Sequence, residues 1–195
     1  RSENNGLSYT YLQDIPFTGS PNISFTDNTA LTDKTSYYYK VVDVSTCNKD
    51  VQESNVGRTI LLKATPFENL VNKLEWNAYE EWDGQVKLYN IYRYYNGIWT
   101  AAPIATVNAN TNTYYDNVAA FLEGTGEFCY LVEATEGPGN IYGFEERSES
   151  NEACAIQEPH LYLPSGFTPG GQNPVFLPHM IYIIKESFQM QVFNR

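Results

Sequence analysis

The stretch "VKLYNIYRYY" (Val86–Tyr95) decides the fold class of this chain. Aromatic and branched apolar residues recur at alternate positions along it, as at Tyr89 and Ile91 or Tyr92 and Tyr94, and a period of two is typical of a β-strand. Most of the 195-residue chain lacks a helical period, and its 16 Tyr and 10 Phe are enough to fill substantial cores. We therefore predict an all-β protein.

Charge and hydropathy exclude two classes of partner. The formal net charge is -11 and Lys and Arg do not cluster, so a phosphate backbone would find no basic surface. The longest apolar run, "MIYII" at residues 180–184, is too short to cross a bilayer, and residue 1 does not open a signal peptide. We expect a soluble chain that neither spans a membrane nor binds nucleic acid.

An internal repeat extends the strand pattern to the N-terminal part of the chain. The segment "FTDNTALTDKTSYYYKV" (25–41) aligns with "YYDNVAAFLEGTGEFCYLV" (114–132), and "ESN" recurs at 53–55 and 149–151. In both copies a Leu lies six positions before an aromatic residue: Leu31 before Tyr37 and Leu122 before Phe128. This spacing is similar to the tyrosine corner of β-sandwiches, so we predict a turn that enters a central strand in each copy.

The second copy contains a complete set of strands for a β-sandwich. The expected strands are residues 61–65, 73–78, 86–94, 104–107, 113–116, 127–134 and 153–156. Trp76 and the Tyr-rich run after it are expected to supply the two halves of the core, while residues 80–84 and 136–140 are expected turns. With its Trp, its corner and the "SN" before the last strand, the region 62–158 resembles a fibronectin type III domain. Phe128 replaces the usual Tyr, so the corner hydrogen bond is expected to be absent there.

The first copy, residues 1–61, is incomplete. Strands are expected at residues 8–13, 24–26, 37–44 and 58–61, but the Trp-bearing strand and its predecessor have no counterpart. Half a sandwich exposes its core, and we expect this partial fibronectin-like module to be unstable alone unless the missing strands lie upstream. The chain begins with Arg1 and ends in the alternating run "QMQVFNR", so we expect it to be an excerpt of a longer protein.

The stretch "LPSGFTPGGQNPVF" (163–176) has the composition of turns and lies between two aromatic runs that favour β-strands. Its Pro and Gly residues disfavour a long helix. Residues 161–195 resemble the start of the gliding-motility-associated C-terminal domain of Bacteroidota surface proteins. The matching positions are Pro164, Phe167, Thr168, Pro169, Gly171, Asn173, Phe176, Phe193, Asn194 and Arg195. In that family a Trp-Gly pair follows the Phe-Asn-Arg that matches residues 193–195. Because this chain stops before that pair, residues 159–195 are expected to be a truncated β domain.

The resemblance implies a cargo of the type IX secretion system, secreted or held at the cell surface of a Gram-negative bacterium. Its implied partners are the outer-membrane translocon and associated shuttle proteins, and surface glycans are a further candidate partner through the region upstream of Arg1. The residues expected to be recognised are Phe167, Thr168, Pro169, Gly171, Asn173 and Phe176. The alternative for Phe176 and Phe193 is that they only fill the core of their own domain.

Two of the three cysteines lie in strands that are antiparallel neighbours in a fibronectin-like sheet. We predict a disulfide between Cys129 and Cys154, which would stabilise the fold by roughly 3 kcal/mol in the chain-entropy model and suits an exported protein. The alternative is two reduced cysteines. Cys47 has no partner in the sequence pattern.

No pattern indicates catalysis, so we expect a protein that is not an enzyme and has no catalytic residues, metal or cofactor. His160 and His179 are the only histidines, and neither lies in a catalytic motif. The acidic turn with Glu80, Glu81 and Asp83 offers oxygen ligands for calcium but lacks the EF-hand spacing, which favours a solvated turn. Glu145 and Glu146 are expected on a strand, where neighbours point to opposite faces and cannot act as a glycosidase pair.

Two functions remain open. The first is a non-enzymatic stalk with an export signal, belonging to an adhesin-like surface protein, and it is the one we favour. The second is a glycan-binding accessory module of a secreted polysaccharide-degrading enzyme. Trp82 and Trp99 would be candidates for stacking on sugars, although packing within the sandwich is the commoner fate of such residues. A planar row of exposed aromatic residues on one sheet face would distinguish the second function.

Overall fold

The protein is built from β-strands joined by turns and loops. The computed structural model describes residues 1–19, 23–47, 49–163, 166, 168, 170–172, 175 and 177–184. These residues form no helix, and all their strand pairs are antiparallel. The predicted all-β class is therefore confirmed.

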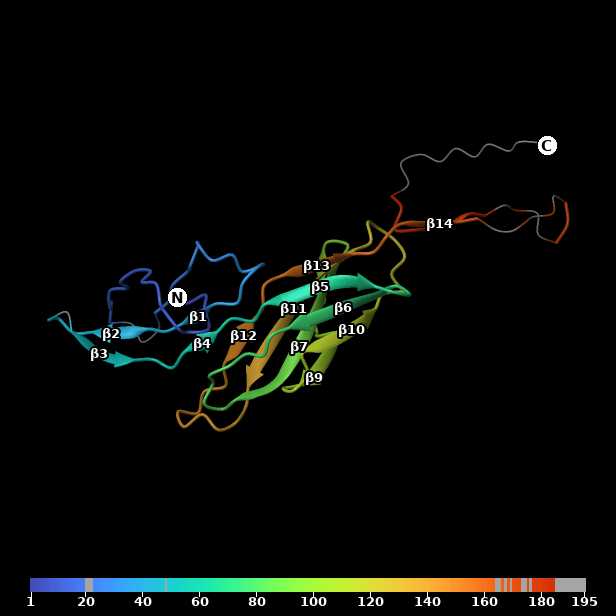
Figure 1. Ribbon diagram of the computed structural model, residues 1–195. Coiled ribbons are helices and arrows are strands. Elements are labelled where there is room, and N and C mark those ends of the chain that lie inside the picture. The colour runs from blue at the N-terminus through green and yellow to red at the C-terminus, as the bar shows by residue number, and fades with distance from the viewer. Residues whose placement is uncertain are drawn as a thin grey trace.

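Two sheets make up the central part of the molecule (Figure 1). One has three strands in the order β10-β6-β5 and the other has six. The first sheet contains β5 (Leu62–Phe67), β6 (Val71–Trp76) and β10 (Thr113–Asn117). The second contains β7 (Val86–Tyr95), β8 (Ile98–Trp99), β9 (Ala105–Asn108), β11 (Glu127–Glu136), β12 (Arg147–Glu149) and β13 (Ala153–Ile156). Each strand expected in this region is present, with shifts at some ends.

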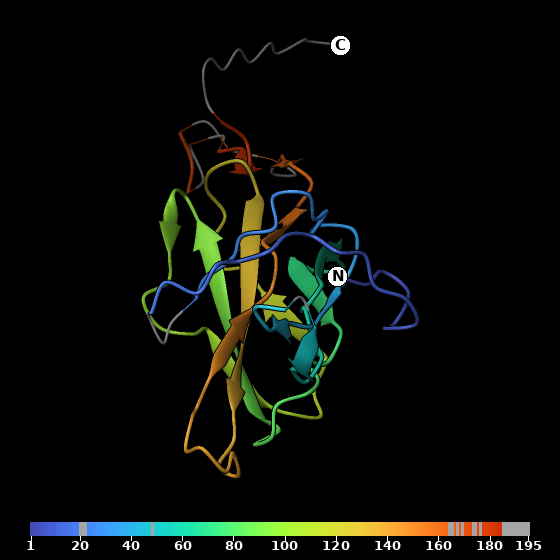
Figure 2. The same cartoon turned by 90° about the vertical axis from the view of Figure 1, so that its left-hand side faces the viewer.

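The core lies between these two sheets. Figure 2 shows the same sheets after a rotation of 90°. Alternate residues of β6 and β7 are buried, including Leu74, Tyr89 and Ile91, because a period of two points them all to one face. Trp76 packs edge-on against Tyr89 with ring centroids 5.6 Å apart. The expected place of Trp76 in the core is confirmed.

A buried polar network also joins the sheets. The Tyr130 hydroxyl donates to Asp116 Oδ2 at 2.8 Å and accepts from Asn72 Nδ2 at 2.7 Å. Arg93 donates to both oxygens of Asp116, and Gln157 donates to Asn72 Oδ1. Burial, together with the charge of Asp116, raises the pKa of Tyr130, so its hydroxyl stays protonated as a donor. Because each buried group has a partner, this network can stabilise the sandwich rather than weaken it.

The N-terminal region forms two small two-stranded sheets instead of a module with a large core. They comprise β1 (Tyr38–Tyr39) with β4 (Gly57–Arg58), and β2 (Val42–Val44) with β3 (Asp50–Glu53). The strands predicted at 8–13 and 24–26 are wrong, the one predicted at 37–44 is interrupted at 40–41, and the one predicted at 58–61 is a strand only at residue 58. No described strand lies beside residues 8–13 or 24–26 to complete a backbone ladder.

Side-chain hydrogen bonds hold this region in place. The Asp27 carboxylate accepts from Arg1 at 2.8 Å, from Tyr39 at 2.9 Å and from both the N–H and the hydroxyl of Thr29. Burial and the bond to Asp27 raise the pKa of Tyr39 to about 12. A carboxylate with this many donors fixes the loop conformation without a strand ladder.

The expected corner is present in the first copy. The Tyr37 hydroxyl accepts the backbone N–H of Leu31 at 2.9 Å, and Tyr37 is buried. In the second copy Phe128 has no hydroxyl to form this bond. There the carbonyl of Leu122 accepts the N–H of Tyr182, a residue from the C-terminal region.

Candidate functional site

The Pro- and Gly-rich stretch lies between the two strands of a short hairpin. Strand β14 (His160–Tyr162) pairs with β15 (His179–Ile181), with Tyr162 opposite His179. In Figure 1 this hairpin lies at the end of the sandwich opposite to β1–β4. The stretch 163–176 is therefore part of a long hairpin connection.

The structure describes two of the six residues expected to be recognised. Thr168 and Gly171 are exposed, and the Gly171 N–H donates to the Thr168 carbonyl at 2.9 Å. A Cβ on residue 171 would lie 2.8 Å from Thr168 Cγ2, so glycine allows this turn to close. The other four, which are Phe167, Pro169, Asn173 and Phe176, lie outside the described residues, as do Pro164, Phe193, Asn194 and Arg195.

Tyr182, just after the hairpin, is part of the sandwich core. Its side chain is buried, and its ring packs edge-on against Phe128 with centroids 6.0 Å apart. Its N–H donates to Leu122, and a Cβ at Gly126 would lie 2.9 Å from its Cγ, so Gly126 allows the close approach. The core thus includes a residue from beyond position 158, where we placed the end of the fibronectin-like module. The sequence offered only the apolar run 180–184 as a signal for this contact.

The predicted disulfide is present. Cys129 on β11 lies directly opposite Cys154 on β13, and the sulfurs are 2.04 Å apart. Cys47 is exposed and free. Among the described residues, Glu127 with these two bonded cysteines is the one group with the spacing of a metal site. Bonded sulfurs are not thiolates, so this group cannot act as a thiolate metal site.

The acidic turn at 80–84 is organised by Glu136 on β11. The Glu136 carboxylate accepts the N–H of Gly84 at 3.0 Å, the amide of Asn140 at 3.1 Å and the N–H of Glu146 at 3.2 Å. Burial acts to raise the pKa of Glu136, but these three donors outweigh burial and lower it. In the turn itself, Glu80 pairs with Arg58 at 2.7 Å. One carboxylate therefore fixes the bases of two loops that are distant in sequence.

The second of these loops, residues 137–146, carries an exposed apolar tip. Ile141, Tyr142 and Phe144 are 81%, 71% and 57% exposed, and the last two rings stack with centroids 6.1 Å apart. Glu145 and Glu146 also lie in this loop, so the prediction that they occupy a strand is wrong. The hydrogen bonds to Glu136 hold the chain in the loop conformation before β12 begins.

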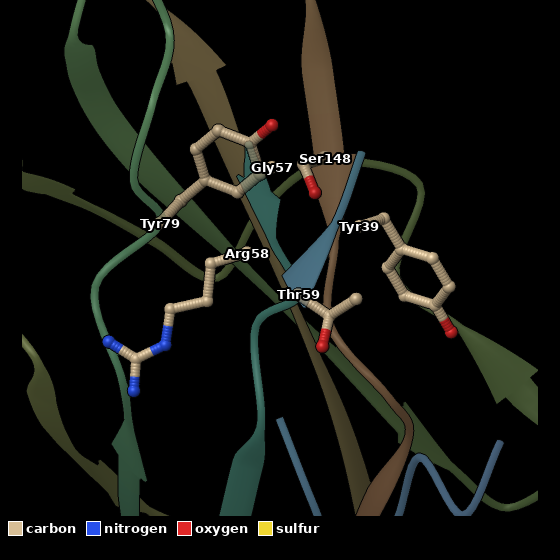
Figure 3. A pocket seen from close by; sticks show the side chains of 6 residues that line it. All are labelled: Tyr39, Gly57, Arg58, Thr59, Tyr79 and Ser148. Carbon is tan, nitrogen blue, oxygen red and sulfur yellow. The ribbon is translucent and has the colours of Figure 1, made fainter. Parts of the chain in front are cut away.

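A small pocket lies where the N-terminal region meets the sandwich. It has a volume of about 190 Å³ and is lined by Tyr39, Gly57, Arg58, Thr59, Tyr79 and Ser148. Figure 3 shows that Arg58 and Tyr39 point to opposite sides rather than toward one another. Polar groups that do not converge give a ligand no fixed orientation, so we interpret this pocket as the joint between the two regions.

The two Trp residues considered for sugar stacking have different surroundings. Trp82 is half-buried and packs on Tyr79 with ring centroids 4.0 Å apart, as expected for internal packing. Trp99 is 37% exposed and lies next to Tyr94 on the surface of the six-stranded sheet. Only Trp99 remains available for contact with a ligand.

Comparison with protein-family models, with curated proteins and with solved structures found no match. Within the described residues, no helix has the length and apolar character needed to span a membrane.

Proposed function

We propose that this chain is the stalk and C-terminal export-signal region of a secreted or cell-surface, adhesin-like protein carried by the type IX secretion system. The observation that supports this most is the C-terminal hairpin. The loop between its strands contains the six residues expected to be recognised. The two that the structure describes, Thr168 and Gly171, form an exposed turn. A turn closed by glycine presents neighbouring side chains at low entropic cost, which suits recognition by a translocon or shuttle protein.

The strand pairing favours a fibronectin type III-like module as the stalk unit. The pairings β5-β6-β10 and β7-β11-β13, and the buried Trp76, are those expected from the resemblance. The bond from Leu31 to Tyr37 favours a related unit in residues 1–61. We retain 62–158 as the complete module and 159–195 as the beginning of the signal domain, with Tyr182 fixing the second to the first.

A spacer role is supported by where the chain enters and leaves the sandwich. The N-terminal strands and the C-terminal hairpin lie at opposite ends in Figure 1. A unit with connections at opposite poles can be repeated to hold a distal region away from the cell. In this proposal the modules are passengers in export and no residue is catalytic.

A reporter fusion tests the export role. A foreign soluble reporter is joined to the protein's own chain from residue 62 onward, which keeps the sandwich that holds the hairpin, with and without residues 1–61, in a Bacteroidota host with an active type IX system. We expect secretion in both cases and retention when the chain from 159 onward is removed. Secretion that requires residues 1–61, or that persists after the removal, contradicts the proposal.

A pair of point variants makes the fusion test specific to the turn. Gly171→Val places a side chain against Thr168 and should reduce secretion, whereas the neighbouring exposed Gln172→Ala should not. If the two variants are secreted equally, this turn is not recognised during export and its assigned role is wrong.

The alternative, a glycan-binding accessory module, is favoured by a different observation. Trp99 and Tyr94 lie together on the outer face of the six-stranded sheet, away from the core. This face does not bear on the export role.

A further inference from the structure

The outer face of the six-stranded sheet carries a row of side chains across four strands, made of two aromatic rings and a disulfide. Tyr94 on β7 is directly opposite Trp99 on β8 and Cys129 on β11, and Cys129 is opposite Cys154 on β13. Phe128 and Tyr130, the neighbours of Cys129, are both fully buried in the core. Because successive side chains of a strand alternate between faces, the row points away from the core. The disulfide joins β11 to β13, and β11 is the neighbour of the strand that carries Tyr94.

A second row on the same face continues the apolar surface. Tyr92 lies two residues before Tyr94 and opposite Leu131, and both are half-buried. Burial, followed by the charge of Glu133, raises the pKa of Tyr92, so this hydroxyl remains protonated at neutral pH. Of the three rings on this face, Tyr92 and Tyr94 are half-buried and Trp99 is 37% exposed.

A polar row borders the rings. The Thr106 hydroxyl donates to Asn90 Oδ1 at 2.8 Å, and Asn90 Nδ2 donates to Glu133 Oε1 at 3.0 Å. Arg147 donates to the other oxygen of Glu133 at 3.3 Å. These groups fix one another across strands β9, β7, β11 and β12, so a ligand meets a pre-organised set of donors and acceptors.

We propose that this face binds a neutral glycan chain. The apolar C–H faces of the sugar rings stack on Trp99, Tyr94 and Tyr92, and the sugar hydroxyls exchange hydrogen bonds with the row from Thr106 to Arg147. The Tyr94 and Trp99 centroids are 5.4 Å apart, close to the length of one sugar residue, and the rings are inclined by 49°. The two rings are therefore not the planar row that we expected of a sugar-binding face, and they suit a chain whose successive sugars are turned relative to one another.

Charge and size argue for this ligand over other classes. The net charge of -11 opposes acidic polysaccharides and nucleic acids, and the one cation named on this face, Arg147, is paired with Glu133. Three half-buried rings also offer much less than the roughly 800 Å² per partner of a standard protein interface. A ligand that combines small apolar faces with many hydroxyls fits this surface, where a row of aromatic rings lies beside a row of polar groups.

Affinity electrophoresis of the chain of residues 1–195 tests the proposal. The gels contain soluble β-1,3-glucan, soluble starch or galactomannan as neutral probes, and alginate as the acidic comparison. We expect retardation by at least one neutral probe and none by alginate. Replacement of both rings in Trp99→Leu/Tyr94→Leu keeps apolar side chains and should weaken binding about fivefold or more. No retardation by any neutral probe, or retardation by alginate alone, overturns the proposal.

The opposite sheet supplies a matched control. Phe67 and Tyr115 are each 51% exposed and form an edge-on pair across β5 and β10. The variant Phe67→Leu/Tyr115→Leu should bind as the parent protein does, and circular dichroism checks that both double variants are folded. Equal loss in both, or loss only in Tyr142→Leu/Phe144→Leu at the tip of loop 137–146, overturns the assignment to this face.

This inference rests on and deepens the alternative function named above, the glycan-binding accessory module, and it does not depend on the export role. The gel uses purified protein, whereas the reporter fusion measures secretion in cells. A negative result in the gel therefore leaves the export proposal untouched, and a negative result in the fusion test leaves the glycan proposal untouched.

Discussion

Tyr37 and Phe128 occupy equivalent positions in the two aligned copies, but they stabilise their surroundings by different means. Tyr37 fixes the turn before it with a hydroxyl that accepts the Leu31 N–H. Phe128 stacks on Tyr95 with ring centroids 4.8 Å apart and meets the edge of Tyr182. Single side chains thus decide whether a turn is held by a hydrogen bond or by packing.

The Tyr37→Phe variant tests the first of these arrangements. It removes the part-buried hydrogen bond from the Leu31 N–H to the Tyr37 hydroxyl, which should destabilise the turn by about 1 kcal/mol. Hydrogen exchange at the Leu31 amide should accelerate about fivefold, because that is the corresponding change in the opening equilibrium. The neighbouring Tyr38→Phe is the control, and unchanged exchange at Leu31 would refute the assigned role of the hydroxyl.

The Glu136 carboxylate is expected to make the stability of the fold depend on pH. Its pKa in the folded protein is lowered, whereas an unfolded Glu titrates near pH 4.3. Its stabilising effect is therefore fully present above about pH 4.3 and is lost as the pH falls through the lower folded pKa. The parent protein should lose more thermal stability between about pH 5 and pH 3 than Glu136→Gln, which cannot titrate there.

Thermal unfolding at several pH values measures this difference. The exposed Glu127→Gln is the matched control on the same strand and should follow the parent curve. Parallel curves for the parent and Glu136→Gln would show that the carboxylate does not stabilise the loop bases.

At the scale of elements, the β14–β15 hairpin depends on the sandwich. A two-stranded sheet is marginally stable alone in water, and each of these strands has three residues. Tyr182 follows directly and inserts beside Phe128, so the hairpin is held by burial of one ring. The element is stable because of its neighbour rather than its own ladder.

The Tyr182→Ala variant should release the hairpin. Loss of a buried aromatic ring should cost about 3 kcal/mol and make residues 159–182 sensitive to protease. The matched control is Tyr162→Ala, since that ring is 66% exposed. Limited proteolysis with mass analysis locates the cleavage, and equal resistance of both variants would contradict the anchoring role.

At the scale of the whole molecule, connections at opposite poles predict an elongated particle. The N-terminal sheets and the C-terminal hairpin extend from opposite ends of the sandwich in Figure 1. A compact chain of 195 residues would have a radius of gyration of about 16 Å by the usual scaling. Small-angle scattering should give a clearly larger value, and a value at the compact limit would rule out a rod.

The sequence by itself determined seven of the nine strands of residues 62–156, the buried position of Trp76 and the pairing of Cys129 with Cys154, while the short strands β8 and β12 were not foreseen. Alternation is a local property, because a period of two places every second side chain on one face whatever lies opposite. Once β11 and β13 are recognised as neighbours, their cysteines need only a matching register.

The same local reasoning was wrong for residues 8–13 and 24–26. A strand exists only where a neighbouring backbone completes its hydrogen bonds, and a pattern in one segment cannot supply that neighbour. The donors around Asp27 come from three separate parts of the N-terminal region, so their convergence was invisible in the sequence.

Only the tertiary structure decided which distant residues meet. Tyr182 enters a core that we expected to end before it, Glu136 joins two loops, and the row from Trp99 to Cys154 forms where four strands come into register. Such contacts depend on how sheets align and on which space remains to be filled, and residues far apart in the chain set both. The candidate glycan face is therefore a property of strand register, whereas the signature near Thr168 and Gly171 is a property of the sequence.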